Sequence, residues 1–415
     1  MTKTMMIRSA VLILYLSTAA IESAEALHLH PHNDRQKISR RKLITTSITA
    51  ASSLSLLSPP LPSVAKSASD KQQWKQWTCD EITPNLCDDL EVTTGELVIR
   101  SIPVKYWRYK RRKNGSNNNN ADDNSTTSSS YPIIAVHGGP GYPHNYMLPL
   151  KQLACNSNRE IIFYDQAGCG QSTQRKGKSV SPSKYPHLLD PAYYSEEELP
   201  ALIEHWKLDK YHILGHSWGT ILAQLFALNA KDTRGLQSLV LSGPLSDAKS
   251  YIAAQWNEDE GSLGSLPPFI QGRIRALEKE GAYNSAEYGA IADVLTTFFT
   301  LRTAPAPDCF TSALAGLNEE VYVGMQGPSE FTLSGVLGDY DVTERLHEID
   351  VPVLLTHGVY DTMRPSIVKT MEKELKYPER VLFPHSGHVS MIDDPEMMND
   401  AVNDFVQRVE RKKRV

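Results

Sequence analysis

The sequence has few cysteines and only a small net charge. Five of its 415 residues are cysteine, and none lies in a CxxC pair or a Cys/His cluster of the kind that binds structural zinc. The formal net charge is −5, so a nucleic-acid-binding surface is not expected. What is left is an ordinary globular composition, 40% hydrophobic and 22% charged, in a chain long enough to bury a large core.

The cysteine count limits the possible disulfides. Because five is an odd number, at least one thiol stays outside any set of intramolecular disulfides. Cys79 and Cys87 are close enough in sequence to pair in an oxidising compartment. Cys169 lies in a glycine-rich segment and is expected to be a small buried residue.

Residues 1–68 are typical of targeting sequence and linker. Lys3 and Arg8 precede an apolar run and then small residues, which predicts a signal peptide cleaved after Ala26; the run is too short to span a bilayer comfortably. Ser39–Ile44, "SRRKLI", precedes a second modest apolar run and resembles a twin-arginine signal. Two signals in tandem favour a plastid or thylakoid lumen. The alternative is one secretory signal followed by a disordered Ser-rich linker.

Strand-like and helical stretches alternate from Gln72 onward. The short apolar runs are "PIIAV", "EIIFYD", "YHIL", "QSLVLS", "VPVLLTH" and "RVLF", which are typical of a buried parallel sheet. With helices between them they predict an α/β-hydrolase core, a mostly parallel sheet with helices on both faces. The core would comprise residues 72–243 and 346–415. Residues 244–345 show helical runs and no clear strand, which predicts an inserted helical cap.

A polar low-complexity run over residues 111–130 interrupts the first part of this core. It cannot bury apolar surface, and we interpret it as the enlarged tip of a hairpin because strand-like runs flank it. It carries sequons at Asn114 and Asn124, which would be glycosylated only if the chain passes through the endoplasmic reticulum.

The segment "YHILGHSWGTIL" places a G-x-S-x-G motif between an apolar strand and a helix. A sharp strand-to-helix turn needs small residues on both sides of the serine, and it lifts the hydroxyl above the sheet. The motif alone is a weak signal, but its context strengthens it and makes Ser217 the candidate nucleophile.

A serine nucleophile needs a base and an orienting acid, which in this fold follow in the order Ser, Asp, His. Asp361 lies in the loop after "VPVLLTH", and His388 lies in the loop after "RVLF". Both loops are at carboxyl ends of strands, where open α/β sheets bind ligands. His385 is the other candidate for the general base, but it lies closer than His388 to the end of the preceding strand. Asp165 precedes Ser217 and is expected to fix its loop.

The segment "AVHGGPGYPHNY" predicts an oxyanion hole. Adjacent glycines let backbone N–H groups approach a developing negative charge without obstruction by side chains. The expected donors are the N–H groups of Gly139 and of Trp218, the residue after the nucleophile. This chemistry requires no metal or cofactor.

Together the motifs "HGGPG", "YDQAGCGQS" and "GHSWG" resemble the proline iminopeptidase family of serine aminopeptidases, from about Glu91 to Val406. The likeness is greatest to the branch of the tricorn-interacting aminopeptidase, which shares a "GPxEF" stretch in its cap. The resemblance implies that two cap glutamates, here Glu287 and Glu330, bind the substrate's free α-amino group. A peptide or amino-acid amide with a free N-terminus is then the expected substrate.

Two other functions stay open at this point. An esterase or lipase-like hydrolase would use the same triad, and the cap glutamates would distinguish the two. A non-catalytic binding protein with this fold is the other alternative, against which the complete triad argues.

Overall fold

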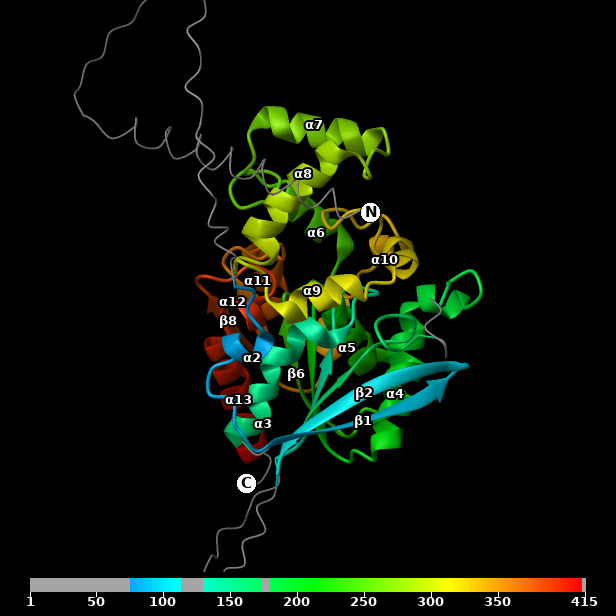
Figure 1. The fold of residues 1–415 in the computed structure, drawn as a ribbon, viewed down its shortest axis with the longest axis vertical. Helices are drawn as coiled ribbons and strands as arrows, with labels where there is room; N and C mark the ends of the chain where they lie inside the picture. Colours follow the sequence, from blue (N-terminus) through cyan, green and yellow to red (C-terminus); the bar gives the residue numbers. More distant parts are fainter. Residues whose placement is uncertain (1–74, 113–129, 158, 174–179, 413–415) are drawn as a thin grey trace, which may run out of the picture. The chain divides into compact units, whose positions relative to one another are not determined.

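The computed structural model describes residues 75–412, except 113–129, 158 and 174–179 (Figure 1). The predicted targeting segments and both sequons lie outside the described residues. Among the helices that are described, none combines the length and apolar character needed to cross a bilayer.

An eight-stranded sheet in the order β1-β2-β4-β3-β5-β6-β7-β8 lies at the centre of the core (Figure 1). Its strands are β1 (Leu90–Ile99), β2 (Ile102–Arg111), β3 (Ile133–Val136), β4 (Ile161–Tyr164), β5 (Tyr211–His216), β6 (Leu236–Ser242), β7 (Val353–Gly358) and β8 (Pro378–Phe383). The β1–β2 and β2–β4 pairs are antiparallel and the other pairs are parallel. Every strand predicted from an apolar run is present, and the mostly parallel sheet confirms the predicted α/β class.

The central strands are apolar throughout because helices cover both faces of the sheet. Successive side chains point to opposite faces, so Ile134 and Val136 join one core cluster while Ile133 and Ala135 join the other. The first cluster is closed by α4 (Leu199–Trp206), α5 (Trp218–Asn229) and α11 (Pro365–Glu374), and the second by η1 (His144–Lys151), α3 (Gln152–Ser157), α12 (Ser390–Asp393) and α13 (Pro395–Lys412).

The predicted hairpin tip at residues 111–130 is wrong. A hairpin would require β2 and β3 to be neighbours, but β4 lies between them in the sheet. The segment therefore connects two strands that do not pair. The error arose because strands that follow each other in sequence usually pair, and here β3 lies on the far side of β4.

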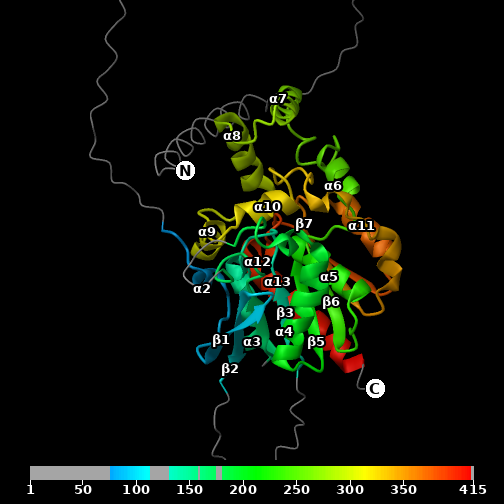
Figure 2. The same cartoon turned by 90° about the vertical axis from the view of Figure 1, so that its right-hand side faces the viewer.

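The chain between β6 and β7 forms a helical cap (Figures 1 and 2). Its helices are α6 (Ala248–Gln255), α7 (Pro268–Lys279), α8 (Ala286–Leu295), η4 (Thr296–Thr300), α9 (Asp308–Ala315), α10 (Glu319–Met325), η5 (Val336–Asp339) and η6 (Thr343–Glu348). Both views place α7 and α8 farthest from the sheet. The outer part of the cap has a small core of its own, which includes Leu263, Ile274, Leu277, Tyr288, Leu295 and Phe331.

Two disulfides fasten the start of the described chain. Cys79 in the short helix α2 (Cys79–Ile82) pairs with Cys309 in α9, and Cys87 pairs with Cys155 in α3. Cys79 and Cys87, although close enough in sequence to pair, do not pair with each other, because each packs against a different helix from later in the chain. Cys169 is free and buried, as predicted.

Loss of the Cys79–Cys309 disulfide should destabilise the fold. The double variant Cys79→Ser/Cys309→Ser should lose about 2–5 kcal/mol of unfolding free energy, because the bond closes a loop of 230 residues in the unfolded chain. The Cys87→Ser/Cys155→Ser variant, whose loop is 68 residues, should lose about 1 kcal/mol less. Urea denaturation of both variants measures the difference. An unchanged urea midpoint in the first variant would contradict the expectation.

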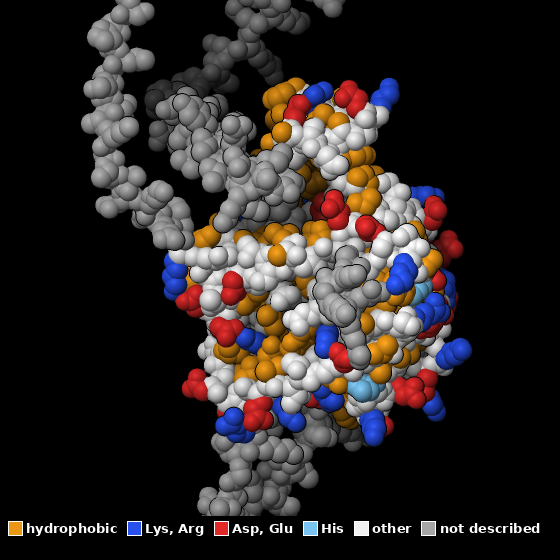
Figure 3. Space-filling model, turned by 45° about the vertical axis from the view of Figure 1, so that its right-hand side comes forward, with side chains coloured by type: hydrophobic (Ala, Val, Ile, Leu, Met, Phe, Trp, Pro, Cys, Tyr) orange, Lys and Arg blue, Asp and Glu red, His pale blue; other side chains and the backbone are white. Residues whose placement is uncertain are grey.

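Charged side chains of both signs are intermingled over the face shown in Figure 3. Exposed ion pairs on the described surface include Arg345 with Glu348 and Arg408 with Glu379. The described part of the face in Figure 3 therefore offers no continuous basic surface of the kind that holds a nucleic-acid backbone.

Candidate active site

Ser217 occupies a strained turn between β5 and α5. Its backbone has φ 55° and ψ −123°, a conformation that costs a non-glycine residue of the order of 1–3 kcal/mol and is found mainly at functional sites. Glycine is required on both sides. A Cβ at Gly215 would lie 2.3 Å from the Gly219 carbonyl oxygen, and one at Gly219 would lie 2.1 Å from the Val136 carbonyl oxygen. The G-x-S-x-G motif therefore reflects close packing at this turn.

Asp361 and His388 form a buried pair beside this turn. Asp361 Oδ1 lies 2.7 Å from His388 Nδ1 and also accepts from the Met363 N–H at 2.8 Å. Burial alone would lower the pKa of His388, but the charge and hydrogen bond of Asp361 outweigh it, so this pKa lies above its usual value. His385, the competitor, is exposed.

The cap and the strand-to-helix turn at Ser217, here called the elbow, both contact the loop that carries His388. The His388 N–H donates to the Phe299 carbonyl of η4 at 2.8 Å, and the ring of His216, the residue before Ser217, lies 4.6 Å from the His388 ring between centroids. Within the described residues, His388 Nε2 is buried and has no hydrogen-bond partner. Ser217 is partly exposed and makes no hydrogen bond to it here, as is common when no substrate is bound.

Two backbone N–H groups have the properties expected of the oxyanion hole. Gly139 has φ +123°, and a Cβ there would lie 2.8 Å from the nitrogens of Gly141 and Tyr142. The Trp218 N–H is the first of α5, where helical amides have no partner within the helix. Neither group donates to another atom of the described residues, so both are available to a negatively charged oxygen.

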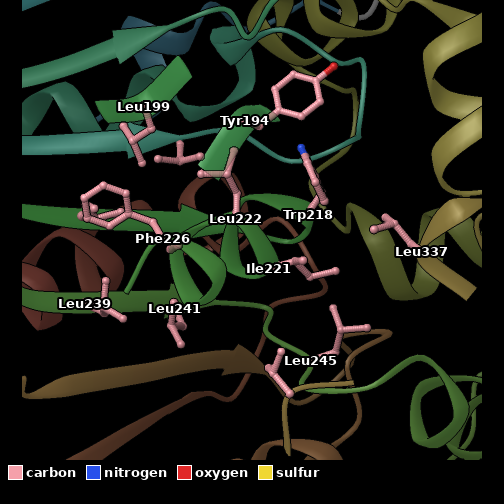
Figure 4. Packing of buried hydrophobic residues seen from close by; sticks show 14 of the residues in the cluster. Tyr194, Leu199, Trp218, Ile221, Leu222, Phe226, Leu239, Leu241, Leu245 and Leu337 are labelled. Carbon is pink, nitrogen blue, oxygen red and sulfur yellow. The ribbon is translucent and has the colours of Figure 1, made fainter. Parts of the chain in front are cut away.

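Ser217 opens into a small cavity whose lining side chains are mostly apolar. In Figure 4, Ile221, Leu245 and Leu337 lie close to the end of α5 that carries Trp218. The full lining is Gly139, Ser217, Trp218, Ile221, Leu245, Tyr251, Gln326, Glu330, Leu333, Leu337 and Met363.

Glu330 is the one acidic side chain of this lining. Tyr322 donates its hydroxyl proton to Glu330 Oε2 at 2.8 Å, and Tyr251 donates to the Glu330 backbone carbonyl at 2.7 Å. Burial raises the pKa of the carboxyl, against the opposing effects of nearby His388 and the Tyr322 hydrogen bond. A bound cation would offset that desolvation.

Known proteins share both the sequence and the fold. The α/β hydrolase fold family matches residues 131–280. A proline iminopeptidase of Levilactobacillus brevis is 35% identical over 269 residues, which cover 64% of this chain and 84% of the relative. One from Saccharolobus solfataricus is 31% identical over 282 residues, which cover 67% and 85%.

The chain belongs to the proline iminopeptidase family. Among solved structures, proline iminopeptidase from Mycobacterium smegmatis aligns with a TM-score of 0.64 at 24% identity and covers 77% of this chain and all of its own. VinJ aligns with the same TM-score at 23% identity over 76% and 99%. These two likenesses show the α/β-hydrolase fold. Membership of the tricorn-interacting branch stays a prediction.

The structure does not bring Glu287 to the Ser217 cavity, where its predicted amine-binding role would require it. This side chain lies on α8 with 48% of its surface exposed, and both carboxylate oxygens accept from Arg273 on α7 at 2.6 Å. The neighbouring Tyr288 faces the cap core, so Glu287 points away from it. Glu287 does not line the Ser217 cavity, and its expected partnership with Glu330 is absent.

Sequence reasoning missed the tyrosines of this site. Tyr146, Tyr251 and Tyr322 all donate or accept within it. Tyr146 ends the segment that predicted the oxyanion hole, but that segment was interpreted only through its glycines, and no motif marks Tyr251 or Tyr322. Asp165 was interpreted correctly, because it accepts from the His144 N–H and from the Gln171 N–H and so fixes its loop.

One group of potential metal ligands exists among the described residues. Cys79, Asp308 and Cys309 have ligand atoms within 4.8 Å of one another. The two sulfurs form a disulfide, which is a poor metal ligand compared with thiolates, and none of the three residues lines the Ser217 cavity.

Proposed function

We propose that this chain is a serine aminopeptidase that releases one N-terminal residue, proline or another small apolar residue, from peptides or amino-acid amides. The observation that carries the proposal is that Ser217, Gly139 and Glu330 line one small cavity together. The relatives named proline iminopeptidase support the reaction class.

The first half of the reaction forms an acyl-enzyme. The Ser217 hydroxyl attacks the carbonyl carbon of the first residue, and its proton passes to His388 Nε2, which is buried and unpartnered in the described structure. Asp361 orients His388 through the 2.7 Å contact and stabilises its cation. The Gly139 and Trp218 N–H groups then bind the negatively charged oxygen.

The second half releases the amino acid. His388 gives its proton to the leaving amine as the C–N bond breaks. A water molecule then attacks the acyl-enzyme while His388 takes a proton from it. Ser217 regains its proton as the free amino acid leaves.

Glu330 gives the site its preference for a chain end. An exopeptidase must distinguish a free ammonium group from an internal amide, and a largely desolvated carboxylate does this by charge. An acylated N-terminus would leave that carboxylate without a positive partner. The apolar side chains among the cavity lining favour a small apolar residue at this position.

A substrate panel tests the proposal. Hydrolysis of Pro-, Ala- and Leu-naphthylamides is compared with that of their N-acetylated forms. We expect the free-amine substrates to be cleaved and the acetylated ones to be poor by at least about 100-fold, since the lost charge pair is worth about 3 kcal/mol or more. Equal cleavage of both sets would identify an esterase-like or amidase-like hydrolase instead.

Activity should follow a bell-shaped pH profile. His388 acts as a base only when neutral, and because Asp361 raises its pKa above the usual 6.5, kcat/KM should fall as the pH drops through a value above 6.5. The substrate amine must be protonated to pair with Glu330, so kcat/KM should also fall above about pH 8, near the usual α-amino pKa. Stopped-time assays over pH 5–10 measure both limbs. A rate that still rises at the alkaline end would contradict the role of the ammonium.

The compartment is proposed on two supports. The N-terminal sequence is typical of a secretory signal, and two disulfides among the described residues favour an oxidising environment. We place the mature enzyme in the secretory pathway or beyond it, with a plastid or thylakoid lumen as the destination if the second signal is used. Microscopy of a fluorescent fusion carrying residues 1–68 separates these destinations.

A further inference from the structure

His216, the second residue of the G-x-S-x-G motif, makes two hydrogen bonds beneath the active site. It is 2% exposed. Its Nε2 lies 2.9 Å from the backbone carbonyl oxygen of His388, and its Nδ1 lies 2.8 Å from the hydroxyl oxygen of Tyr146. The His216 side chain therefore contacts both the loop of the base and the helix η1.

The donor and the acceptor can be assigned for each hydrogen bond that links Gly138, Tyr146, His216 and His388. The Gly138 N–H can only donate, and it lies 2.6 Å from the Tyr146 hydroxyl oxygen. The Tyr146 proton is then free for His216 Nδ1, which leaves the proton of the neutral ring on Nε2, where it donates to the His388 carbonyl. Burial lowers the pKa of His216 to about 3, so the ring stays neutral throughout the working range of the enzyme.

These hydrogen bonds connect the loop after β3 with the loop after β8, which the sheet does not join directly. Gly138 precedes Gly139, an oxyanion donor in the proposed function, and follows β3. His388 follows β8, and β5, β6 and β7 lie between these two strands. His216 ends β5 and reaches both loops from there.

We propose that Tyr146 and His216 are positioning residues of the reaction, which set the distance between the oxyanion donor Gly139 and the base His388. The proposal rests on the proposed function of this site. Productive geometry requires the reacting groups to be held to a fraction of an ångström. Removal of the Tyr146 hydroxyl leaves the Gly138 N–H and His216 Nδ1 without these partners, and removal of the His216 ring leaves the His388 carbonyl without its donor. The loops should therefore shift, and the transition state should lose stabilisation while substrate binding is retained.

Tyr146→Phe is the primary test because it removes one hydroxyl and little volume. We expect kcat to fall about 10–100-fold with KM changed less than about 3-fold, since the interaction matters in the transition state. Labelling of Ser217 by a fluorophosphonate should slow by a similar factor. Tyr193→Phe is the matched control. It loses a buried hydroxyl hydrogen bond to Glu198, which is not one of the hydrogen bonds between Gly138 and His388, and it should keep the wild-type kcat and labelling rate.

A matched pair at His216 tests the same idea by rescue. The Gln side chain of His216→Gln has a donor for the His388 carbonyl and an acceptor for Tyr146, whereas His216→Leu of similar volume has neither. The Gln variant should keep at least about 10-fold more activity and label faster. Thermal unfolding of all variants shows which are folded, and activities and labelling rates are compared among the folded variants only.

The outcomes separate this proposal from the proposed function. Unchanged labelling and kcat in folded Tyr146→Phe overturn the positioning role, as does equal activity of the Gln and Leu variants. If wild-type protein labels with the fluorophosphonate but cleaves no aminoacyl substrate, the aminopeptidase assignment fails, and the labelling rates of the variants still decide the role of Tyr146 and His216.

Discussion

Replacing Ser217 with alanine should abolish peptide and amide hydrolysis, with kcat reduced about 10⁴–10⁶-fold. The hydroxyl is the proposed nucleophile, and no other described side chain of the cavity combines an exposed hydroxyl with a neighbouring buried Asp–His pair. Losses of this size are expected when a member of a catalytic triad is removed, and the oxyanion donors account for the residual rate. KM should change little, because the amine and the side chain of the substrate bind elsewhere in the cavity.

The measurement is steady-state hydrolysis of the best naphthylamide, together with fluorophosphonate labelling of the wild type and the variant. Ser195→Ala is the matched control, since it makes the same substitution at a buried serine whose hydroxyl donates to the Pro191 carbonyl away from the cavity. Activity of Ser217→Ala near the wild-type level would remove Ser217 from its role. Failure of wild-type protein to label would instead favour a non-catalytic binding protein with this fold.

Replacing Glu330 with glutamine should lower kcat/KM for free-amine substrates by about 30–1,000-fold. The amide keeps the size of the carboxyl group and can still accept from the Tyr322 hydroxyl, which now donates at 2.8 Å. Only the charge is lost. Truncating one partner of a buried charge pair costs about 2–4 kcal/mol, which corresponds to this range. The selectivity for free over N-acetylated substrates should collapse in the same variant.

Glu287→Gln is the control that the structure supplies. It makes the same chemical change on an exposed glutamate of the cap, paired with Arg273 outside the cavity, and surface ion pairs contribute little. It should leave kcat and KM unchanged. Should Glu287→Gln impair binding while Glu330→Gln does not, the assignment of the amine site in this structure is wrong.

The strands and the order of the candidate site residues were predictable because both depend on local patterns. A strand buried on two faces is an apolar run, and such runs gave β3 to β7, while a shorter apolar run gave the edge strand β8. The elbow needs glycine at positions 215 and 219 for reasons that act within a few residues, so its motif is visible in the sequence. Asp361 and His388 could be found because each follows its own strand, at the same edge of the sheet.

The disulfides and the position of residues 111–130 were not predictable, because they depend on which elements become neighbours. Cys79 lies near Cys87 in sequence, but its α2 helix packs against α9, 230 residues later. The run after β2 looked like a hairpin because nothing in either strand shows that β4 inserts between them. Contacts between segments so far apart in the sequence leave no pattern in the residues around either one.

The cap shows the same division within a single pair of residues. Glu287 and Glu330 were both assigned to amine binding by resemblance, and the sequence around each does not show which way its side chain points. Folding places Glu330 beside Tyr322 in the cavity of Ser217, and it places Glu287 beside Arg273 on the outside.

By itself the sequence determined the α/β class, the nucleophile elbow and the Ser–Asp–His order, because backbone sterics and hydrophobic periodicity act over short distances along the chain. Only the tertiary structure decided which cysteines pair, which glutamate enters the cavity, and that Tyr146 and His216 join the loops of Gly139 and His388. Those outcomes depend on the packing of segments that are remote in sequence, where a side chain's partner is set by the three-dimensional arrangement and not by its neighbours in the chain.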